Sequence, residues 1–366
     1  MLLTLVLQTD DKIRVLIPES RYPPPSLLRS SAIEYFTGKK GIHMKTQAFF
    51  RALCIAAGLA TASLAALAQN YPNRPVRMIV PFPPGSGSDV AARVIGQHLS
   101  TALGQPFVAE NKPGAGGSIG AMEVVRASPD GYTLMFGSSS SLAANVALLK
   151  NMPYDPAKDL APVAGVADSV TALIVKSDFP AKNLQEFIAY VKQRPGKVNG
   201  GYGSSSTQIS IAVLNKLAGL DVVAVPYKGT PLAVNDVLAG TLDFAFADLG
   251  NALPHVKAGT LRGIGLTTPK RSSMVPDWPP IADTLPGYDD ITGWIAIVGP
   301  VGLPKDVADK LSAATSLALQ QPEVKNKLAF SGLSPMPMSP EQLRGFIGTE
   351  IPKWIRMAKE AKIQPE

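Results

Sequence analysis

The sequence predicts an α/β protein in which strands alternate with helices and form parallel sheets covered on both faces. Of its 366 residues, 46% are hydrophobic and 17% are charged, which is typical of a globular chain. A chain of this length is expected to form about two domains. The 33 Pro and 32 Gly indicate many short elements joined by sharp turns. Short apolar, β-branched runs recur ahead of helical patterns, and this alternation favours parallel sheets with helical crossovers.

The first strand–helix unit follows Tyr71. Residues 76–80 form a short apolar run typical of a strand, and residues 81–88 form a loop rich in Pro, Gly and Ser. Residues 89–103 then place apolar side chains at helical spacing, which predicts an amphipathic helix. In such folds ligands bind beyond the carboxyl ends of the strands, so the loop between strand and helix is a candidate site.

The same pattern continues along the chain. Further strand–helix pairs are predicted at 107–109 and 118–127, 134–136 and 138–149, 173–175 and 184–192, 201–202 and 208–217, 222–225 and 231–238, and 244–247 and 252–257. Strands at 264–266 and 294–298 and helices at 305–319, 322–330 and 340–362 complete the prediction. The last helix has strong start signals, namely Ser339 as N-cap, Pro340 at the first helical position and Gln342 three residues after the cap. Pro352 should kink this helix.

The N-terminal part of the sequence indicates a targeting segment rather than a folded domain. From Met44 a basic start, an apolar run over 52–67 and the triplet 66–68 before Gln69 predict a secretory signal peptide at 44–68, and hence a periplasmic location. The alternative is a membrane anchor, because the run approaches the roughly 20 residues that span a bilayer. Residues 1–43 fit neither, which predicts a non-native or disordered extension upstream of the true start.

Composition excludes several function classes. Cys54 is the only cysteine and lies in the predicted signal peptide, so the mature chain offers no disulfide, thiolate nucleophile or Cys-ligated zinc. The net charge of +7 falls to +3 beyond residue 68 without a cluster of Lys or Arg, which argues against nucleic acid as a partner. We expect no metal and no cofactor.

Three helix-opening loops carry the candidate site. Their residues are Phe82, Pro84, Gly85, Ser86, Gly87, Ser88 and Asp89; Ser138, Ser139 and Ser140; and Gly203, Ser204, Ser205, Ser206 and Thr207. Each loop offers amides and hydroxyls at a positive helix end but neither Lys nor Arg, which suits a carboxylate better than a triphosphate. For any single loop, the alternative is that Ser and Gly only cap a helix and turn a corner.

Other chemistries fit less well. The run Gly114 to Gly120 carries Ile119 where a dinucleotide fingerprint needs glycine, and a Walker lysine does not follow. A hydrolase would need a base, yet beyond residue 68 the only histidines are His98, deep in a predicted helix, and His255. Asp248 ends a strand, where it could either cap the next helix or contact a ligand.

Five motifs in order resemble the periplasmic solute receptors of tripartite tricarboxylate transporters, the Bug family. They are Tyr-Pro-Asn-Arg-Pro at 71–75, Val-Pro-Phe-Pro-Pro-Gly at 80–85, Glu-Asn-Lys-Pro-Gly-Ala-Gly-Gly at 110–117, Pro-Tyr-Asp-Pro at 153–156 and Val-Pro-Tyr-Lys-Gly at 225–229. The resemblance implies a type II periplasmic-binding-protein fold: two α/β domains joined by two crossovers, with a ligand cleft between them. Domain 1 would comprise 69–170 and 295–366, and domain 2 would comprise 171–294.

The resemblance also implies roles for particular residues. The loop over 82–89 would receive a carboxylate through amides and ordered waters, and the loop over 203–207 would close over it. Tyr227, within the last motif, is predicted to contact the ligand. Asp248 matches a position that can pair with an ammonium group in amino-acid-binding members of the family. Where this chain has Ser86, Ser118 and Gln208, the family usually has Gly, usually Asn and often His. These departures bear on the identity of the ligand rather than on the class of protein. We expect Gly85 to let the backbone approach the ligand closely.

The resulting interpretation is a non-catalytic, monomeric receptor for a small carboxylate: a di- or tricarboxylate, an aromatic acid or an amino acid. Its partners would be that ligand and the membrane subunits of the transporter. Two alternatives stay open, a hydrolase or transferase using the serine-rich loops and an orphan sensor subunit of a signalling protein. Neighbouring genes for a small and a large membrane subunit would separate transport from sensing.

Overall fold

The computed structural model describes residues 5–9, 12–16, 71–288 and 290–365. Strands β1 (Leu5–Thr9) and β2 (Lys12–Leu16) pair antiparallel, with Leu5 opposite Leu16, inside the predicted N-terminal extension. The rest of that extension, the predicted signal peptide and the alternative anchor lie outside the described residues. Within the described ranges, no helix has the length and apolar character needed to cross a bilayer.

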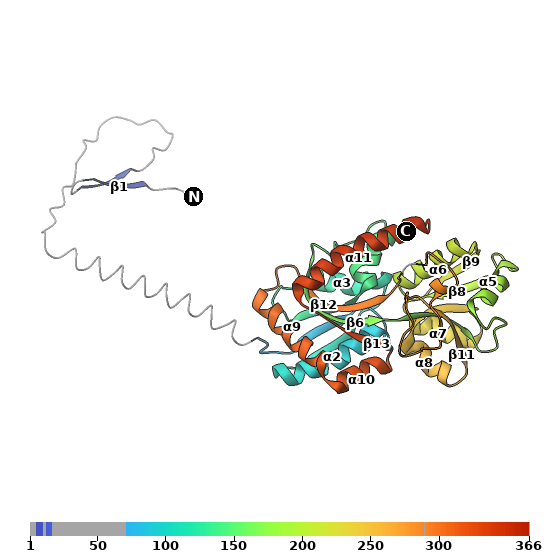
Figure 1. The fold of residues 1–366 in the computed structure, drawn as a ribbon. Coiled ribbons are helices and arrows are strands. Elements are labelled where there is room, and N and C mark those ends of the chain that lie inside the picture. Colours follow the sequence, from blue (N-terminus) through green and yellow to red (C-terminus); the bar gives the residue numbers. More distant parts are fainter. Residues whose placement is uncertain (1–4, 10–11, 17–70, 289, 366) are drawn as a thin grey trace, which may run out of the picture. The chain divides into compact units, whose positions relative to one another are not determined.

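A six-stranded sheet organises what we call the first lobe (Figure 1). Its strand order is β13 (Leu333–Met338), β6 (Leu160–Ser169), β12 (Gly293–Pro300), β5 (Thr133–Ser138), β3 (Val76–Val80) and β4 (Phe107–Asn111). Helices α2 (Gly87–Leu103), α9 (Lys305–Gln320) and α10 (Pro322–Phe330) bury apolar side chains against one face. Helices α3 (Ser118–Val125) and α11 (Pro340–Glu360) cover the other face.

A five-stranded sheet organises the second lobe. Its strand order is β11 (Leu261–Leu266), β7 (Thr171–Lys176), β10 (Phe244–Asp248), β8 (Val198–Tyr202) and β9 (Val222–Pro226). Helices α5 (Leu184–Lys192) and α6 (Ser205–Ala218) pack on one face, and α7 (Thr230–Ala239) and α8 (Leu249–Lys257) pack on the other. Each lobe is therefore a sheet between two helical layers, as expected for alternating strands and helices.

The chain crosses between the lobes twice. It passes from β6 to β7 at Val170 and returns between β11 and β12 over residues 267–292, a connection that contains the 3₁₀ helix η3 (Ile281–Asp283). The predicted two-domain α/β class with two crossovers is confirmed. The predicted domain limits after residue 170 and before residue 295 stay a prediction.

The expectation that both sheets are parallel is wrong for the strands beside the crossovers. Strands β3, β4 and β5 run parallel to one another, as do β8, β9 and β10. By contrast, β12 pairs antiparallel with β5 and β6, β13 with β6, and β7 with β10 and β11. Only Val170 separates β6 from β7, so the chain continues directly from one sheet into the next instead of turning back through a helix.

Besides β1 and β2, two strands of the first lobe were not predicted. Strand β6 contains Pro162 and Gly165, and β13 contains Pro335 and Pro337, residues that weaken a strand pattern. Strand β13 lies at the edge of its sheet, where proline is tolerated. A Cβ at Gly165 would lie 2.6 Å from the carbonyl oxygen of Met336, so glycine there lets β13 approach β6.

The remaining elements agree with the sequence to within a few residues, with one exception. Residues 138–149, predicted as one helix, form a π-helical turn η2 (Ser140–Ala144) followed by α4 (Asn145–Leu148). A short 3₁₀ turn, η1 (Ala115–Gly117), precedes α3. The capping box of α11 is present, with Ser339 Oγ accepting from the Gln342 amide at 3.2 Å and Gln342 Oε1 accepting from the Ser339 amide at 2.9 Å. Pro352 lies inside the continuous α11, and a kink there stays a prediction.

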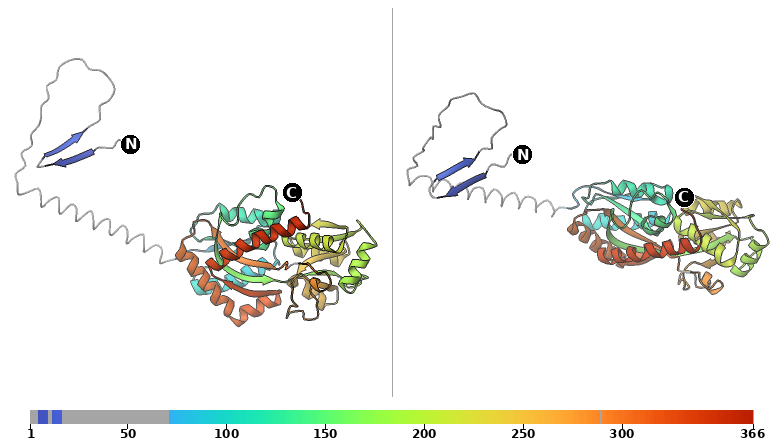
Figure 2. Two further views of the ribbon diagram at one scale, coloured as in Figure 1. Left: turned by 45° about the horizontal axis from the view of Figure 1, so that its top comes forward. Right: turned by 90° about the horizontal axis from the view of Figure 1, so that it is seen from above.

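Helix α11 links the two lobes. It runs along the first lobe, and its C-terminal end reaches α6 of the second lobe (Figure 2). Met357 near that end and Leu217 of α6 line a common small pocket. On the same side of the molecule, Tyr288 of the second crossover donates a hydrogen bond from its Oη to the carbonyl of Ser210 in α6 at 3.3 Å.

Candidate ligand-binding cleft

A small cavity lies between the two lobes where the predicted loops meet. Its volume is about 50 Å³, which suits a small molecule. Its lining residues are Phe82, Ser86, Gly87, Ser88, Ser138, Ser139, Ser140, Ser169, Ser204, Ser206, Thr230, Asp248, Gly293, Trp294 and Ile295. All three predicted loops therefore contribute residues to the lining of one cavity.

The loop before α2 forms the first wall. Ser86 is the N-cap of α2, with its Oγ accepting from the Asp89 amide at 3.4 Å. Asp89 is buried and does not line the cavity; it accepts hydrogen bonds from the Gly85 amide (3.0 Å) and Asn111 Nδ2 (2.9 Å) and from the guanidinium of Arg93 (3.0 Å). Burial opposes ionisation, but these three donors outweigh it and lower the pKa of Asp89. Asp89 thus holds the loop in shape.

Gly85 has a structural role in the turn before α2. Its φ is +81°, a left-handed conformation that disfavours side chains, and no protein atom lies within 4 Å of where its Cβ would be. Its amide is already used by Asp89. The turn therefore requires glycine at position 85 for its backbone conformation, and the predicted ligand contact of Gly85 stays a prediction. Pro84 also does not line the cavity.

The serine-rich loop after β5 forms a second part of this wall. The Ser138 amide donates to Ser141 Oγ at 3.1 Å, and the Ser140 amide donates to Ser138 Oγ at 3.2 Å. Tyr154, which does not line the cavity, donates from Oη to the Ser141 carbonyl at 2.5 Å. These bonds hold Ser139 and Ser140, both almost fully buried, at the cavity surface.

The second lobe supplies the opposite wall. Ser204 caps α6 in a capping box with Thr207, and both Ser204 and Ser206 line the cavity. Gly203, Ser205 and Thr207 lie in this loop but do not line the cavity. A Cβ at Gly203 would overlap the backbone nitrogen of Thr230, so the glycine lets the loop and the start of α7 pack together.

Tyr227 also lies away from the cavity. Its Oη donates to Asp236 Oδ2 at 2.5 Å, and partial burial together with that carboxylate raises its pKa to about 12. This bond joins the segment after β9 to α7, the helix whose first residue, Thr230, does line the cavity. The direct ligand contact predicted for Tyr227 gains no support from its position.

Asp248 lies beside the first crossover. It occupies the N-cap position of α8, but its side chain makes no capping hydrogen bond; Oδ1 instead accepts from Ser169 Oγ at 2.9 Å. Of the two alternatives left open by the sequence, capping by the side chain is therefore wrong. Burial raises the pKa of Asp248, opposed by hydrogen bonds from Ser169 and Thr171. Asp248 is the only charged residue in the cavity lining.

The sequence did not single out five lining residues: Ser169, Thr230, Gly293, Trp294 and Ile295. Four of them belong to the strands that adjoin the crossovers, where local pattern carries no signal for a site. Trp294 is buried, donates from Nε1 to Glu350 Oε2 at 2.8 Å and packs edge-to-face on Phe346 with ring centroids 5.1 Å apart. Thr230 could have been found, because it directly follows the Tyr-Lys-Gly motif.

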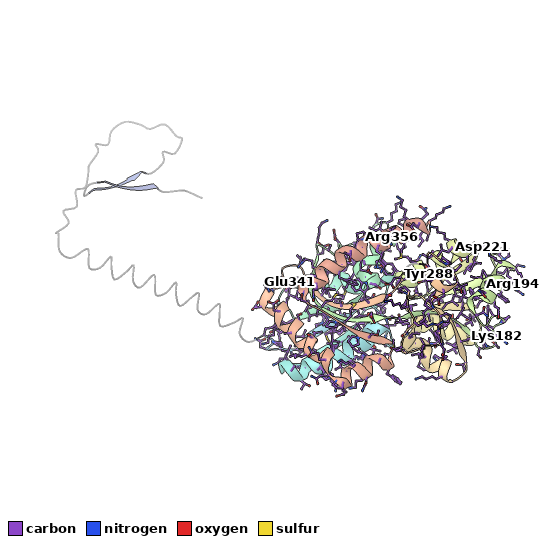
Figure 3. The ribbon with its side chains drawn as sticks, viewed as in Figure 1. Lys182, Arg194, Asp221, Tyr288, Glu341 and Arg356 are labelled. Carbon is purple, nitrogen blue, oxygen red and sulfur yellow. The ribbon has the colours of Figure 1, made fainter. Side chains whose placement is uncertain are left out.

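The lining defines the chemistry that the cavity can perform. Neither Lys, Arg nor His lines it, so an anion would be held by hydroxyls and backbone amides at the N-termini of α2, α6 and α7. Charged side chains labelled in Figure 3 lie elsewhere: Lys182, Arg194 and Asp221 at the far end of the second lobe and Glu341 at the far end of the first. Within the described ranges, His, Cys, Asp and Glu nowhere gather in threes to hold a metal.

Comparison with known proteins places this chain in a family. Residues 91–363 match the family model described as the tripartite tricarboxylate transporter family receptor. The chain belongs to this receptor family. Among curated receptors, Protein BugT of Bordetella pertussis (strain Tohama I) is 35% identical over 309 residues, covering 82% of this chain and 94% of BugT. The resemblance drawn from the five motifs is thereby confirmed.

Solved receptor structures share the fold. One is Rpa4515 of R. palustris with adipate, with TM-score 0.78, 31% identity and coverage of 81% of this chain and 100% of that chain. Another is MatC (Rpa3494) from Rhodopseudomonas palustris with bound malate, with TM-score 0.74, 33% identity and coverage of 78% and 99%. The family consists of periplasmic substrate-binding receptors, which agrees with a cleft between two lobes.

Proposed function

We propose that this receptor captures a small carboxylate in the cavity between its lobes and delivers it to the membrane subunits of a tripartite tricarboxylate-type transporter. The observation that carries the proposal is the convergence of helix N-termini and serine hydroxyls from both lobes on one small cavity without Lys or Arg. The relatives with adipate and with bound malate support a carboxylate as the ligand class.

Within that class, we propose a ligand that carries an ammonium group, such as an amino acid. Asp248 is the only charge in the lining, and its partly buried carboxylate has only neutral donors as partners. A second carboxylate placed beside it would be repelled, whereas an ammonium group would neutralise it. The ligand's own carboxylate would then face the hydroxyls and amides of the loops before α2 and α6.

Nothing in the cavity favours a hydrolase or transferase. Its serines have no histidine beside them, because neither His98 nor His255 lines the cavity. We therefore propose a receptor without catalytic activity. An orphan sensor would use the same cavity, and its genes would lack the neighbouring small and large membrane subunits that a transporter needs.

The test is a thermal-shift screen of the purified receptor against malate, adipate, tricarboxylates, aromatic acids and amino acids. A cognate ligand at 100 times its dissociation constant should stabilise the fold by about 2.7 kcal/mol and raise the melting temperature accordingly. We expect amino acids to give the largest shift. If none of these acids stabilises the protein, the receptor proposal fails.

We further propose that the receptor reaches the periplasm through cleavage of residues 44–68. Its family is periplasmic, and the basic start, apolar run and Ala-Leu-Ala triplet are typical of a cleaved signal. The intact mass of the protein recovered from the periplasm should correspond to a chain starting at or near Gln69. A secreted form that retains residues 1–43 would contradict both the cleavage and the start at Met44.

A further inference from the structure

One side chain joins the two lobes without touching the cavity. Asn145 of the first lobe is fully buried, and its Oδ1 accepts a short hydrogen bond from Ser205 Oγ at the start of α6 in the second lobe. Asn145 Nδ2 donates to the Gly116 carbonyl at 3.1 Å and to Ser118 Oγ at 3.3 Å, both in the first lobe. Asn145 is thus held in place on its own lobe and offers its oxygen to the other.

The surroundings of this bond are shaped for close approach. Gly116 has a φ of +61°, and a Cβ there would lie 2.9 Å from Asn145 Oδ1 and 3.2 Å from Ser205 Oγ. A side chain at position 116 would therefore crowd both Asn145 and Ser205, and glycine there lets these two side chains approach each other. Ser205 itself is only 6% exposed, so water has little access to compete for the bond.

A second hydrogen bond between the lobes differs in one respect. The Ser206 amide donates to Ser140 Oγ at 3.3 Å, and both residues line the cavity. A ligand anion would compete for these donors. Asn145 and Ser205 do not line the cavity, so their bond can persist whether or not a ligand is present.

We propose that the Asn145–Ser205 hydrogen bond is a latch that stabilises the closed arrangement of the lobes, making Asn145 a positioning residue for ligand capture. The proposal rests on the receptor function proposed above. A receptor whose closed state is more populated binds its ligand with higher apparent affinity, even though the latch itself contacts no ligand.

The experiment measures lobe closure without a ligand. Spin labels on Gln97→Cys in α2 and Gln185→Cys in α5 place one exposed probe on each lobe, and Cys54→Ala removes the only other thiol. Electron–electron double resonance then gives the distribution of distances between the lobes. The parent protein should show a closed component, and Ser205→Ala should lower the closed-to-open ratio about fivefold, the effect of one neutral hydrogen bond.

Two further variants make the result decisive. Ser210→Ala removes another buried hydroxyl of α6, one that donates only to the Ser206 carbonyl of its own helix, and should leave the ratio unchanged. Asn145→Ala should lower the ratio as Ser205→Ala does, and the double variant should add nothing further.

The latch is overturned if the parent protein shows no closed component, if Ser205→Ala leaves the ratio unchanged, or if the two substitutions act additively. Because no ligand is used, these results are independent of the thermal-shift screen. A failure of the latch therefore leaves the receptor function standing, and a failed screen leaves the distance result interpretable.

Discussion

Replacing Asp248 by asparagine is expected to weaken binding of an amino acid by about 10- to 150-fold, because a hydrogen bond to a charged group contributes about 1.5 to 3 kcal/mol. The carboxylate that pairs with the ammonium group would be lost, while the size of the side chain and its acceptor for Ser169 Oγ are kept. Isothermal titration of both proteins with the most stabilising amino acid of the thermal-shift screen measures this change.

The same substitution should affect the stability of the unliganded protein in the opposite direction. Burial raises the pKa of Asp248, so the folded state holds the proton more tightly than the unfolded chain. The stability contributed by protonated Asp248 is full below the unfolded pKa of about 3.9 and is lost as the pH rises through the higher folded pKa. Asp248→Asn should therefore melt at a higher temperature than the parent near neutral pH, with the difference vanishing below about pH 4.

A matched control separates this role from general charge effects. Asp243→Asn changes an acid just before the same strand, one that accepts from the Asn199 amide at 2.7 Å and does not line the cavity. It should leave ligand affinity unchanged. If Asp248→Asn instead binds malate or adipate more tightly than the parent and amino acids equally well, the ligand is a dicarboxylate and the proposed ammonium pairing is wrong.

Replacing Glu350 by alanine should destabilise the fold by about 2 to 6 kcal/mol, because each of two buried donors that loses its acceptor costs about 1 to 3 kcal/mol. Glu350 is 5% exposed and accepts from the indole nitrogens of Trp294 (2.8 Å) and Trp354 (3.0 Å), and it forms an ion pair with Lys353 at 3.0 Å. Alanine would leave both buried indole N–H groups without an acceptor. Denaturant unfolding monitored by tryptophan fluorescence measures the loss.

Two variants of the same helix act as controls. Glu350→Gln keeps an acceptor but removes the charge, so it should cost less than Glu350→Ala. Glu360→Ala removes an exposed acid whose contact with Arg356 is 4.0 Å long, and its effect should stay within about 0.5 kcal/mol. An unfolding free energy of Glu350→Ala equal to that of the parent would show that the two indoles find other partners. Because Trp294 lines the cavity, Glu350→Ala should also weaken ligand binding in the fraction that remains folded.

Local sequence signals predicted much of the cavity lining. Each serine-rich loop lies between a strand pattern and a helix pattern, and the carboxyl ends of parallel strands meet at one edge of a sheet. For that reason Ser86, Ser139 and Ser204 could be assigned to one site from their positions in the chain alone. The same argument could not separate lining residues from their neighbours. Asp89 and Tyr227 face partners within their own lobes, and only the structure shows where their hydrogen bonds go.

The sequence by itself determined the α/β class, most helices and strands, and the absence of basic groups from the candidate loops, because hydrophobic period and turn chemistry act over a few residues. The tertiary structure alone decided that β6 and β12 run antiparallel through the crossovers, that Asp248 turns from its helix toward Ser169, and that Asn145 meets Ser205. Each of these two hydrogen bonds joins residues that are 60 or more positions apart in the sequence. Such pairings depend on how the two lobes pack, which no local pattern encodes.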